Sequence, residues 1–258
     1  GFPNKGDVHE IKLGDSVQVA FNMRNYGDSS ASGTVKISEK QHGIFRDEAI
    51  SFDLEGLRSA VTGRTAGTEI QPRTLMPIVY APYQYDKQIF DANSFGLVEI
   101  EMNYYYETKL SGEICVASLL AASENRLNEC KSTEIISERQ LQGGGLHPVS
   151  VEKIEKKTEQ FQDSYKVILD IYLKDYGSGS SYILGDINNF NLELQSGISV
   201  AECEQKPFKF DNKKTSKVRC SFRITSQEGV TRIPFKISFN YPYKVVKVVE
   251  IDFAKEKT

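Results

Sequence analysis

The stretch Tyr165–Tyr172 reads YKVILDIY, and large apolar residues occupy every second position in it. This period of two places the apolar side chains on one face of an extended strand, whereas an amphipathic helix repeats every ~3.6 residues. Gly96–Tyr106, GLVEIEMNYYY, and Ser16–Asn25, SVQVAFNMRN, alternate in the same way. All three stretches therefore predict half-buried β-strands.

The same signal recurs along most of the chain, with clusters of turn-forming residues between the segments. Further strands are predicted at Thr34–Ser38, Gly112–Ser118, Cys130–Ser137, Val149–Ile154, Phe190–Leu194, Val218–Ile224, Ile233–Asn240 and Lys244–Phe253. Helical signals are confined to a possible turn or two at residues 122–129. Many short strands separated by turns predict an all-β fold, and they fit a sandwich better than a barrel.

A glycine-rich joint at residues 143–148, GGGLHP, interrupts this pattern, and the strand signals restart after it. Two echoes link the flanking segments: Asn25-Tyr26-Gly27 returns as Asp175-Tyr176-Gly177, and residues 99–106 resemble residues 236–243. Duplication of one sandwich domain would explain why the two pairs of similar segments occur in the same order along the chain.

The sequence therefore predicts two tandem immunoglobulin-like β-sandwich domains, residues 1–142 and 149–258, joined by a flexible linker at 143–148. Residues 39–76 carry few strand signals. We expect a long inserted loop there, or strands without the usual alternation.

Composition excludes several classes of protein. The 258 residues are 39% hydrophobic and 26% charged, with a net charge of −3, which favours neither nucleic acid nor an anionic membrane. No apolar run is long enough to cross a bilayer as a helix. The chain opens at Gly1 without a Met, so we expect that any export signal or membrane anchor precedes this residue.

Charge differs between the two predicted domains. Residues 1–142 hold 14 Lys+Arg against 20 Asp+Glu, while residues 143–258 hold 18 against 15. The negative first domain of one copy could attract the positive second domain of another, which would allow a head-to-tail contact. Chance variation in composition along the chain would give the same asymmetry. The run Glu152–Lys157 mixes acidic and basic residues and predicts a solvated edge strand.

The four cysteines form two pairs that are close in sequence, Cys115 with Cys130 and Cys203 with Cys220. They lack the CxxC spacing typical of zinc ribbons, so we predict two disulfides and an oxidising, extracytoplasmic location. The alternative is four reduced cysteines in the core of a cytosolic protein.

No pattern for catalysis or cofactor binding is recognised, so the chain is predicted to be non-enzymatic. His9, His42 and His147 are far apart, and neither GxSxG nor a phosphate-binding loop is present. Asp186–Asn189 and Asp211-Asn212 supply too few oxygens for calcium, so they are interpreted as turns.

Two groups of tyrosines are the candidate interface. They are Tyr80, Tyr83, Tyr85, Tyr104, Tyr105 and Tyr106. Tyrosine favours protein interfaces because an apolar ring carries a polar tip, and the same rings can also pack within a sheet or stack on carbohydrate. The chain has no Trp, which weakens the carbohydrate interpretation.

The order of signals resembles a group of uncharacterised, membrane-anchored surface proteins of small-genome archaea, with adhesion-type (CARDB-like) immunoglobulin-like domains. The resemblance rests on VAFNMRNYG at 19–27, LEGL at 54–57, NYYYET at 103–108, ICV at 114–116, Cys130, GGLHPVSV at 144–151, and Cys203 and Cys220 before a Tyr-Pro-Tyr strand. The family's anchor helix has no counterpart at the front of this chain. The resemblance implies a surface location and contact with other proteins, without a specific ligand.

Together these features predict a cell-surface structural or adhesion protein that contacts other surface proteins, with no cofactor, metal or nucleic acid. The alternatives are a carbohydrate-binding module and accessory domains of a larger surface enzyme.

Overall fold

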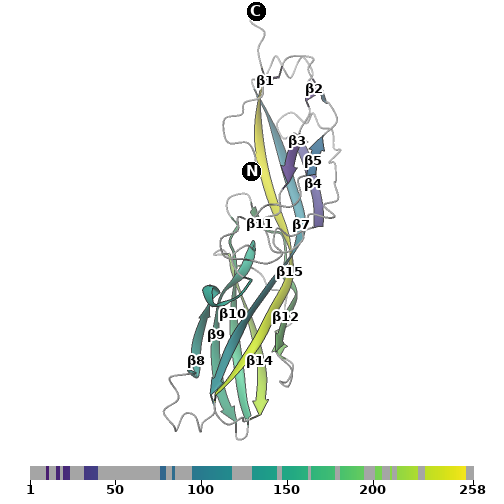
Figure 1. Cartoon of the computed structure of the whole chain (residues 1–258). Helices are drawn as coiled ribbons and strands as arrows, with labels where there is room; N and C mark the ends of the chain where they lie inside the picture. Colours follow the sequence, from purple (N-terminus) through teal and green to yellow (C-terminus); the bar gives the residue numbers. More distant parts are fainter. Residues whose placement is uncertain are drawn as a thin grey trace, which may run out of the picture. The chain divides into compact units, whose positions relative to one another are not determined.

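A computed structural model of the chain describes residues 10–11, 16–17, 20–23, 32–39, 76–79, 83–84, 95–117, 130–143, 147–161, 164–177, 181–194, 201–204, 210, 214–225 and 230–253 (Figure 1). Apart from one short 3₁₀ helix, η2 (Glu138–Gln140), every element in these ranges is a β-strand. The strands are β1 (Glu10–Ile11), β2 (Ser16–Val17), β3 (Ala20–Met23), β4 (Ser32–Glu39), β5 (Met76–Val79), β6 (Tyr83–Gln84), β7 (Phe95–Ala117), β8 (Thr133–Ser137), β9 (Val149–Phe161), β10 (Ser164–Asp175), β11 (Ser181–Ile183), β12 (Asn188–Leu194), β13 (Glu202–Cys203), β14 (Thr215–Thr225) and β15 (Val230–Phe253). The predicted all-β class is confirmed.

Two larger sheets organise the strands. The six-stranded sheet has the order β1-β15-β7-β4, with β11 and β12 also pairing with β15. The five-stranded sheet has the order β13-β14-β10-β9-β8. Two small sheets pair β2 with β6 and β3 with β5.

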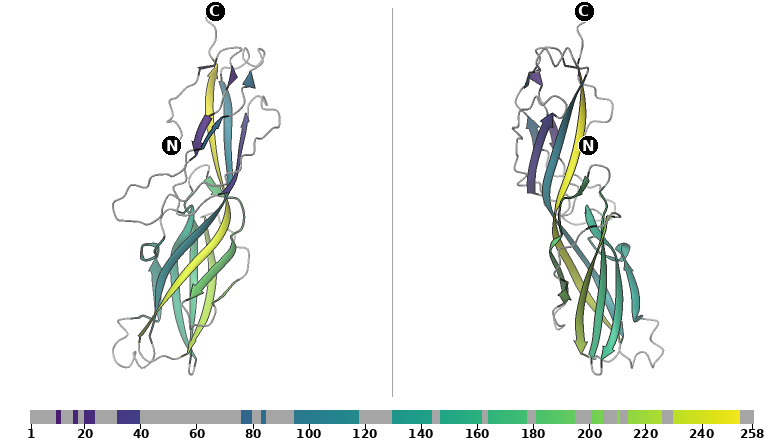
Figure 2. Two further views of the ribbon diagram at one scale, coloured as in Figure 1. Left: turned by 45° about the vertical axis from the view of Figure 1, so that its right-hand side comes forward. Right: turned by 180° about the vertical axis from the view of Figure 1, so that it is seen from behind.

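The chain divides into two compact units whose composition differs from the two segments predicted from the sequence. Unit 1 comprises residues 1–105, 179–182 and 243–258; unit 2 comprises 106–178 and 183–242. Both β7 and β15 contribute residues to both units (Figure 2). Each unit therefore takes strands from both sides of the glycine-rich joint.

Long strands account for this difference. The predicted strand Gly96–Tyr106 and residues 112–117 of the next predicted strand belong to one strand, β7, and β15 likewise continues through Pro242. Glycine and proline normally punctuate strands. Gly112 is instead required for packing, because a Cβ there would lie 2.6 Å from the ring of Phe235.

The echo between residues 99–106 and 236–243 also has a different explanation from duplication. These segments lie in β7 and β15, which are neighbours in one sheet. Tyr104 packs against Tyr243 and Tyr106 against Tyr241, with ring centroids 5.7 and 5.9 Å apart. The similar sequences are thus two adjacent strands running in opposite directions, where aromatic cross-strand pairs stabilise the sheet.

The core of unit 2 lies between its two sheets. In β10 every second residue is buried, as the alternation predicts. Within unit 2, the buried apolar residues of β10 and β15 are Tyr165, Val167, Leu169, Ile171 and Leu173, and Ile233, Phe235, Ile237, Phe239 and Tyr241. Burial of each large apolar side chain contributes ~1.5–3 kcal/mol, so this layer is the main source of stability for the unit.

Unit 1 has a smaller described core on its part of the six-stranded sheet. Val35 and Ile37 of β4 and Val98 and Ile100 of β7 are buried. Ile37 lies directly opposite Ile100 in the antiparallel β4–β7 register. The predicted inserted segment 39–76 lies outside the described residues, apart from its two ends in β4 and β5.

The described part of the predicted linker is packed within unit 2. Gln142, the residue just before it, forms an antiparallel bridge with Ser111 of β7. His147 is buried, its ring Nε2 lies 2.7 Å from the Gly143 carbonyl oxygen, and its ring packs on Tyr106. These residues therefore serve as part of the sandwich.

Candidate interaction surface

The outer side of the five-stranded sheet carries an array of charged side chains, and we call it the charged face. It consists of Lys153, Glu155, Lys157 and Glu159 of β9, Lys166, Asp170, Tyr172 and Lys174 of β10, and Lys217, Arg219 and Arg223 of β14. The alternation that buries one side of β10 places these residues on the other.

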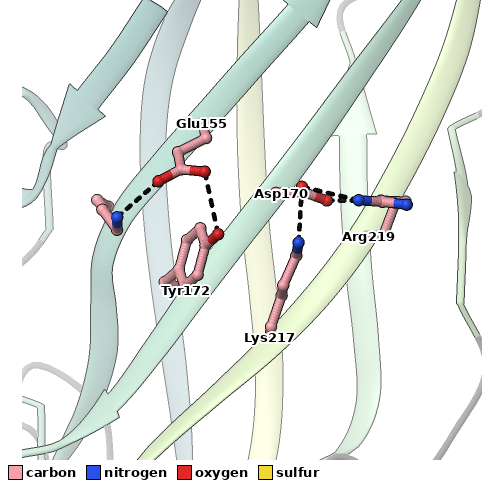
Figure 3. A network of polar contacts seen from close by, with 6 residues as sticks. Glu155, Asp170, Tyr172, Lys217 and Arg219 are labelled. Atoms are coloured by element: carbon pink, nitrogen blue, oxygen red, sulfur yellow. Dashed lines mark hydrogen bonds and ion pairs between the residues drawn. The ribbon is translucent and has the colours of Figure 1, made fainter.

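Asp170 is the centre of one ion cluster (Figure 3). Arg219, directly opposite on β14, donates two hydrogen bonds of 2.6 and 2.9 Å to its carboxylate, and Lys217 approaches to 2.7 Å. The bonds from Arg219, with Lys217, lower the pKa of Asp170 to about 2, although partial burial opposes the shift. A paired, bidentate contact of this kind fixes the geometry of neighbouring strands.

A second cluster surrounds Tyr172 (Figure 3). Its hydroxyl donates to Glu155 at 3.0 Å, and Lys153 donates to the same carboxylate at 2.6 Å. These bonds, first that from Lys153, lower the pKa of Glu155. The ammonium groups of Lys153 and Lys217 lie 4.4 and 5.4 Å from the Tyr172 ring centroid, within the range of cation–π attraction.

The charges of this face are therefore largely satisfied by one another. Exposed ion pairs each contribute only ~0–1 kcal/mol and are screened by salt. The face is polar and crossed by ion pairs, and it suits recognition by complementary charge better than apolar docking.

Lys156 departs from the predicted solvated edge. β9 lies inside the sheet between β10 and β8, and the Lys156 side chain is fully buried. Its ammonium donates to the Cys115 carbonyl at 2.5 Å and to Glu134 at 2.9 Å. The mixed acidic and basic run at residues 152–157 contains no signal that distinguishes Lys156 from its exposed neighbours.

Both predicted disulfides are present. Cys115 in β7 bonds to Cys130, which precedes β8, so this bridge ties the two sheets of unit 2. Cys203 bonds to Cys220, its directly opposite partner in the β13–β14 register. Two disulfides indicate an oxidising environment.

The tyrosine groups are only partly brought together. Tyr104 and Tyr106 share one side of β7, where Tyr106 is buried, while Tyr105 points the other way and is 66% exposed. Tyr83 pairs with Val17 in the small β2–β6 sheet. Tyr80 and Tyr85 lie outside the described residues. An interface through these six residues stays a prediction.

Unit 2 also has a groove of about 650 Å³ along β7 and β15. Its lining includes Ser111, Gln142, Glu193 and Lys236, and Glu193 lies opposite Lys236 in the β12–β15 register. The aromatic residue in this lining, Phe235, is 2% exposed, so the groove offers little aromatic surface for stacking on a sugar.

Within the described ranges, no cluster of three or more His, Cys, Asp or Glu side chains is arranged to hold a metal ion. His9, His42 and Asp211-Asn212 lie outside those ranges. A search of the same ranges finds no helix long and apolar enough to cross a membrane.

These features define the class: an all-β, disulfide-bonded protein with an array of paired charges on one face of its five-stranded sheet. Compared with known protein families, curated proteins and solved structures, the chain shows no significant match in any of the three.

Proposed function

We propose that this chain is a non-enzymatic structural or adhesion protein of the cell surface that acts by contact with other surface proteins. The observation that carries the proposal is the pair of disulfides in an all-β fold. Closing short loops of this length stabilises a fold by ~3 kcal/mol each through loop-closure entropy. That gain is available only in an oxidising compartment.

The charged face supports contact as the mode of action. Its residues are held by ion pairs and by the strand register, so a partner meets a preorganised pattern of charge. Such patterns contribute specificity and association rate more than affinity. A segment upstream of Gly1 would serve as the anchor, and the immunoglobulin-like character of each unit belongs to the same proposal.

Cross-linking on intact cells that produce the protein tests this function. A lysine-reactive cross-linker that cannot cross membranes should join the chain to another surface protein, with links mapping to charged-face lysines. Lys166→Glu reverses one charge of this face and should reduce these links several-fold. Lys247→Glu, a matched change at an exposed position of β15 in unit 1, should leave them unchanged.

Labelling of the chain only after cell lysis would refute the surface location. Equal links for both variants would refute a role for the charged face. The carbohydrate alternative predicts binding of the purified chain to a glycan array, and the contact proposal predicts none.

A further inference from the structure

The strand β8 forms one end of the five-stranded sheet. Among the described residues it pairs with β9 alone, and it lies at the margin of the sheet in Figure 1. The backbone N–H of Thr158 donates to the Ser132 carbonyl at 2.9 Å, so Ser132 and Thr158 form a hydrogen-bonded pair and fix which residues of β8 bond to β9. In an antiparallel ladder, bonded and non-bonded pairs alternate. The backbone groups of Thr133, Ile135 and Ser137 therefore point away from β9.

On its outward-facing side, this edge lacks the usual protection against strand addition. Natural edges carry Lys, Pro, bulges or very short strands. β8 reads TEIIS and pairs with β9 without a register shift. Thr133, Ile135 and Ser137 are all exposed and uncharged, and Ile135 is 62% exposed. The opposite end of the sheet is formed by the two-residue strand β13.

We propose that two copies of this chain pair edge to edge through β8, antiparallel about Ile135. This register places Ile135 opposite the second copy's Ile135, and Thr133 opposite the second copy's Ser137. Each of these residues directs its backbone groups to the edge, so the hydrogen-bonding phases of the two copies match. The arrangement is a two-fold, self-complementary interface.

The chemistry of the strand argues for a second copy as the occupant. At the centre, one apolar side chain meets its own equivalent, and the flanking Thr–Ser pairs can share hydrogen bonds. No like charges oppose each other on this side of the strand, because Glu134 points to the buried side and pairs with Lys156. The proposal goes beyond the surface function, since it depends on strand register alone.

The dimer should be weak and controlled by one side chain. Two five-residue strands bury less than the ~1,200 Å² of a standard stable interface, so association depends on concentration. Gln140 accepts the edge N–H of Ser137 through its side-chain Oε1 at 2.8 Å. This contact competes with pairing, so Gln140→Ala should increase the dimer fraction.

Cysteine cross-linking tests the register. At a bonded antiparallel pair the Cα atoms lie ~5.5 Å apart, within the range of a disulfide. Ile135→Cys should therefore give a disulfide-linked dimer under mild oxidation, at least ten-fold faster than Val248→Cys, an exposed site on β15. Thr133→Cys alone should behave like that control, whereas Thr133→Cys with Ser137→Cys should cross-link. Peptide mapping should join position 135 of one copy to position 135 of the other.

Equal rates for Ile135→Cys and Val248→Cys would overturn the proposal, as would equal rates for Ile135→Cys and Thr133→Cys. Sedimentation of the unmodified chain provides an independent measurement. The dimer should form as the concentration approaches ~1 mM, a range typical of weak association, and Ile135→Lys should abolish it. Salt should change it little, whereas a charge-guided head-to-tail contact would weaken with salt. A strict monomer at the highest concentration, with Gln140→Ala also monomeric, would overturn it.

Discussion

The hydroxyl oxygen of Tyr241 accepts the backbone N–H of Val149 at 3.1 Å, which joins β15 of one sheet to the start of β9 in the other. Thr108 of β7 lies 3.2 Å from the same hydroxyl and donates to the Val149 carbonyl at 2.7 Å. All three residues are buried. The hydrogen bonds among these three residues thus fix how the two sheets of unit 2 pack, because buried polar atoms require hydrogen-bond partners.

Tyr241→Phe should lower the free energy of unfolding by ~1–2 kcal/mol, because the Val149 N–H loses its partner inside the core. Chemical denaturation monitored by circular dichroism measures this change. Tyr105→Phe, at a position 66% exposed, is the matched control and should have almost no effect. Equal stability of Tyr241→Phe and the unmodified protein would show that the hydroxyl is dispensable.

Asp170→Asn should destabilise the protein at neutral pH by ~1–2 kcal/mol, because Arg219 and Lys217 lose their anionic partner. The folded-state pKa of Asp170 is lowered to about 2. The ionised Asp170 therefore stabilises the fold fully above ~4, the pKa of an Asp in the unfolded chain. This stabilisation is lost as the pH falls from that value towards the folded-state pKa of about 2. Unfolding curves of the two proteins should converge near pH 2. A constant difference down to that pH would contradict the assignment.

The ion pair between the buried Lys156 and the half-buried Glu134 gives a prediction about charge inside the sheet. Glu134→Gln removes the carboxylate and leaves the Lys156 ammonium with the Cys115 carbonyl, so we expect a loss of ~1–3 kcal/mol. Lys156→Met removes the buried charge while keeping a similar shape, so its cost should be smaller. Urea denaturation measures the free energy of unfolding of both variants. A larger loss of stability for Lys156→Met than for Glu134→Gln would contradict this prediction.

The composition of unit 2 predicts how fragments behave. A fragment of residues 149–258 lacks residues 106–117 of β7 and all of β8, which belong to the same unit. Phe235 and Tyr241 would then lose their neighbours on β7, so the fragment should be unfolded by circular dichroism. A fragment of residues 95–258 retains every strand of unit 2 and should unfold cooperatively. Cooperative unfolding of the shorter fragment would instead support the predicted division at the glycine-rich joint.

The strands themselves were the most predictable part of this fold. The alternation at residues 165–172 predicts the buried side of β10, and local pairing of Cys115 with Cys130 and of Cys203 with Cys220 matches the structure. These features depend on neighbours in sequence, which a single sequence records directly.

The grouping of strands into units was not predictable in the same way. Gly112 and Pro242 have the signature of strand ends, yet each lies within a long strand whose continuation depends on packing in three dimensions. Lys156 likewise reads as an exposed residue, because its burial follows from the position of β9 inside the sheet. Long-range contacts of this kind leave no local pattern.

The proposed extracytoplasmic location depends on the two disulfides, and trapping the thiols in the producing cells tests it most directly. Cells are quenched in acid, alkylated before any reduction, and the protein is mapped by mass spectrometry. We predict that none of the four cysteines is alkylated and that non-reduced peptides join Cys115 to Cys130 and Cys203 to Cys220. Alkylation of all four cysteines before reduction would contradict the account.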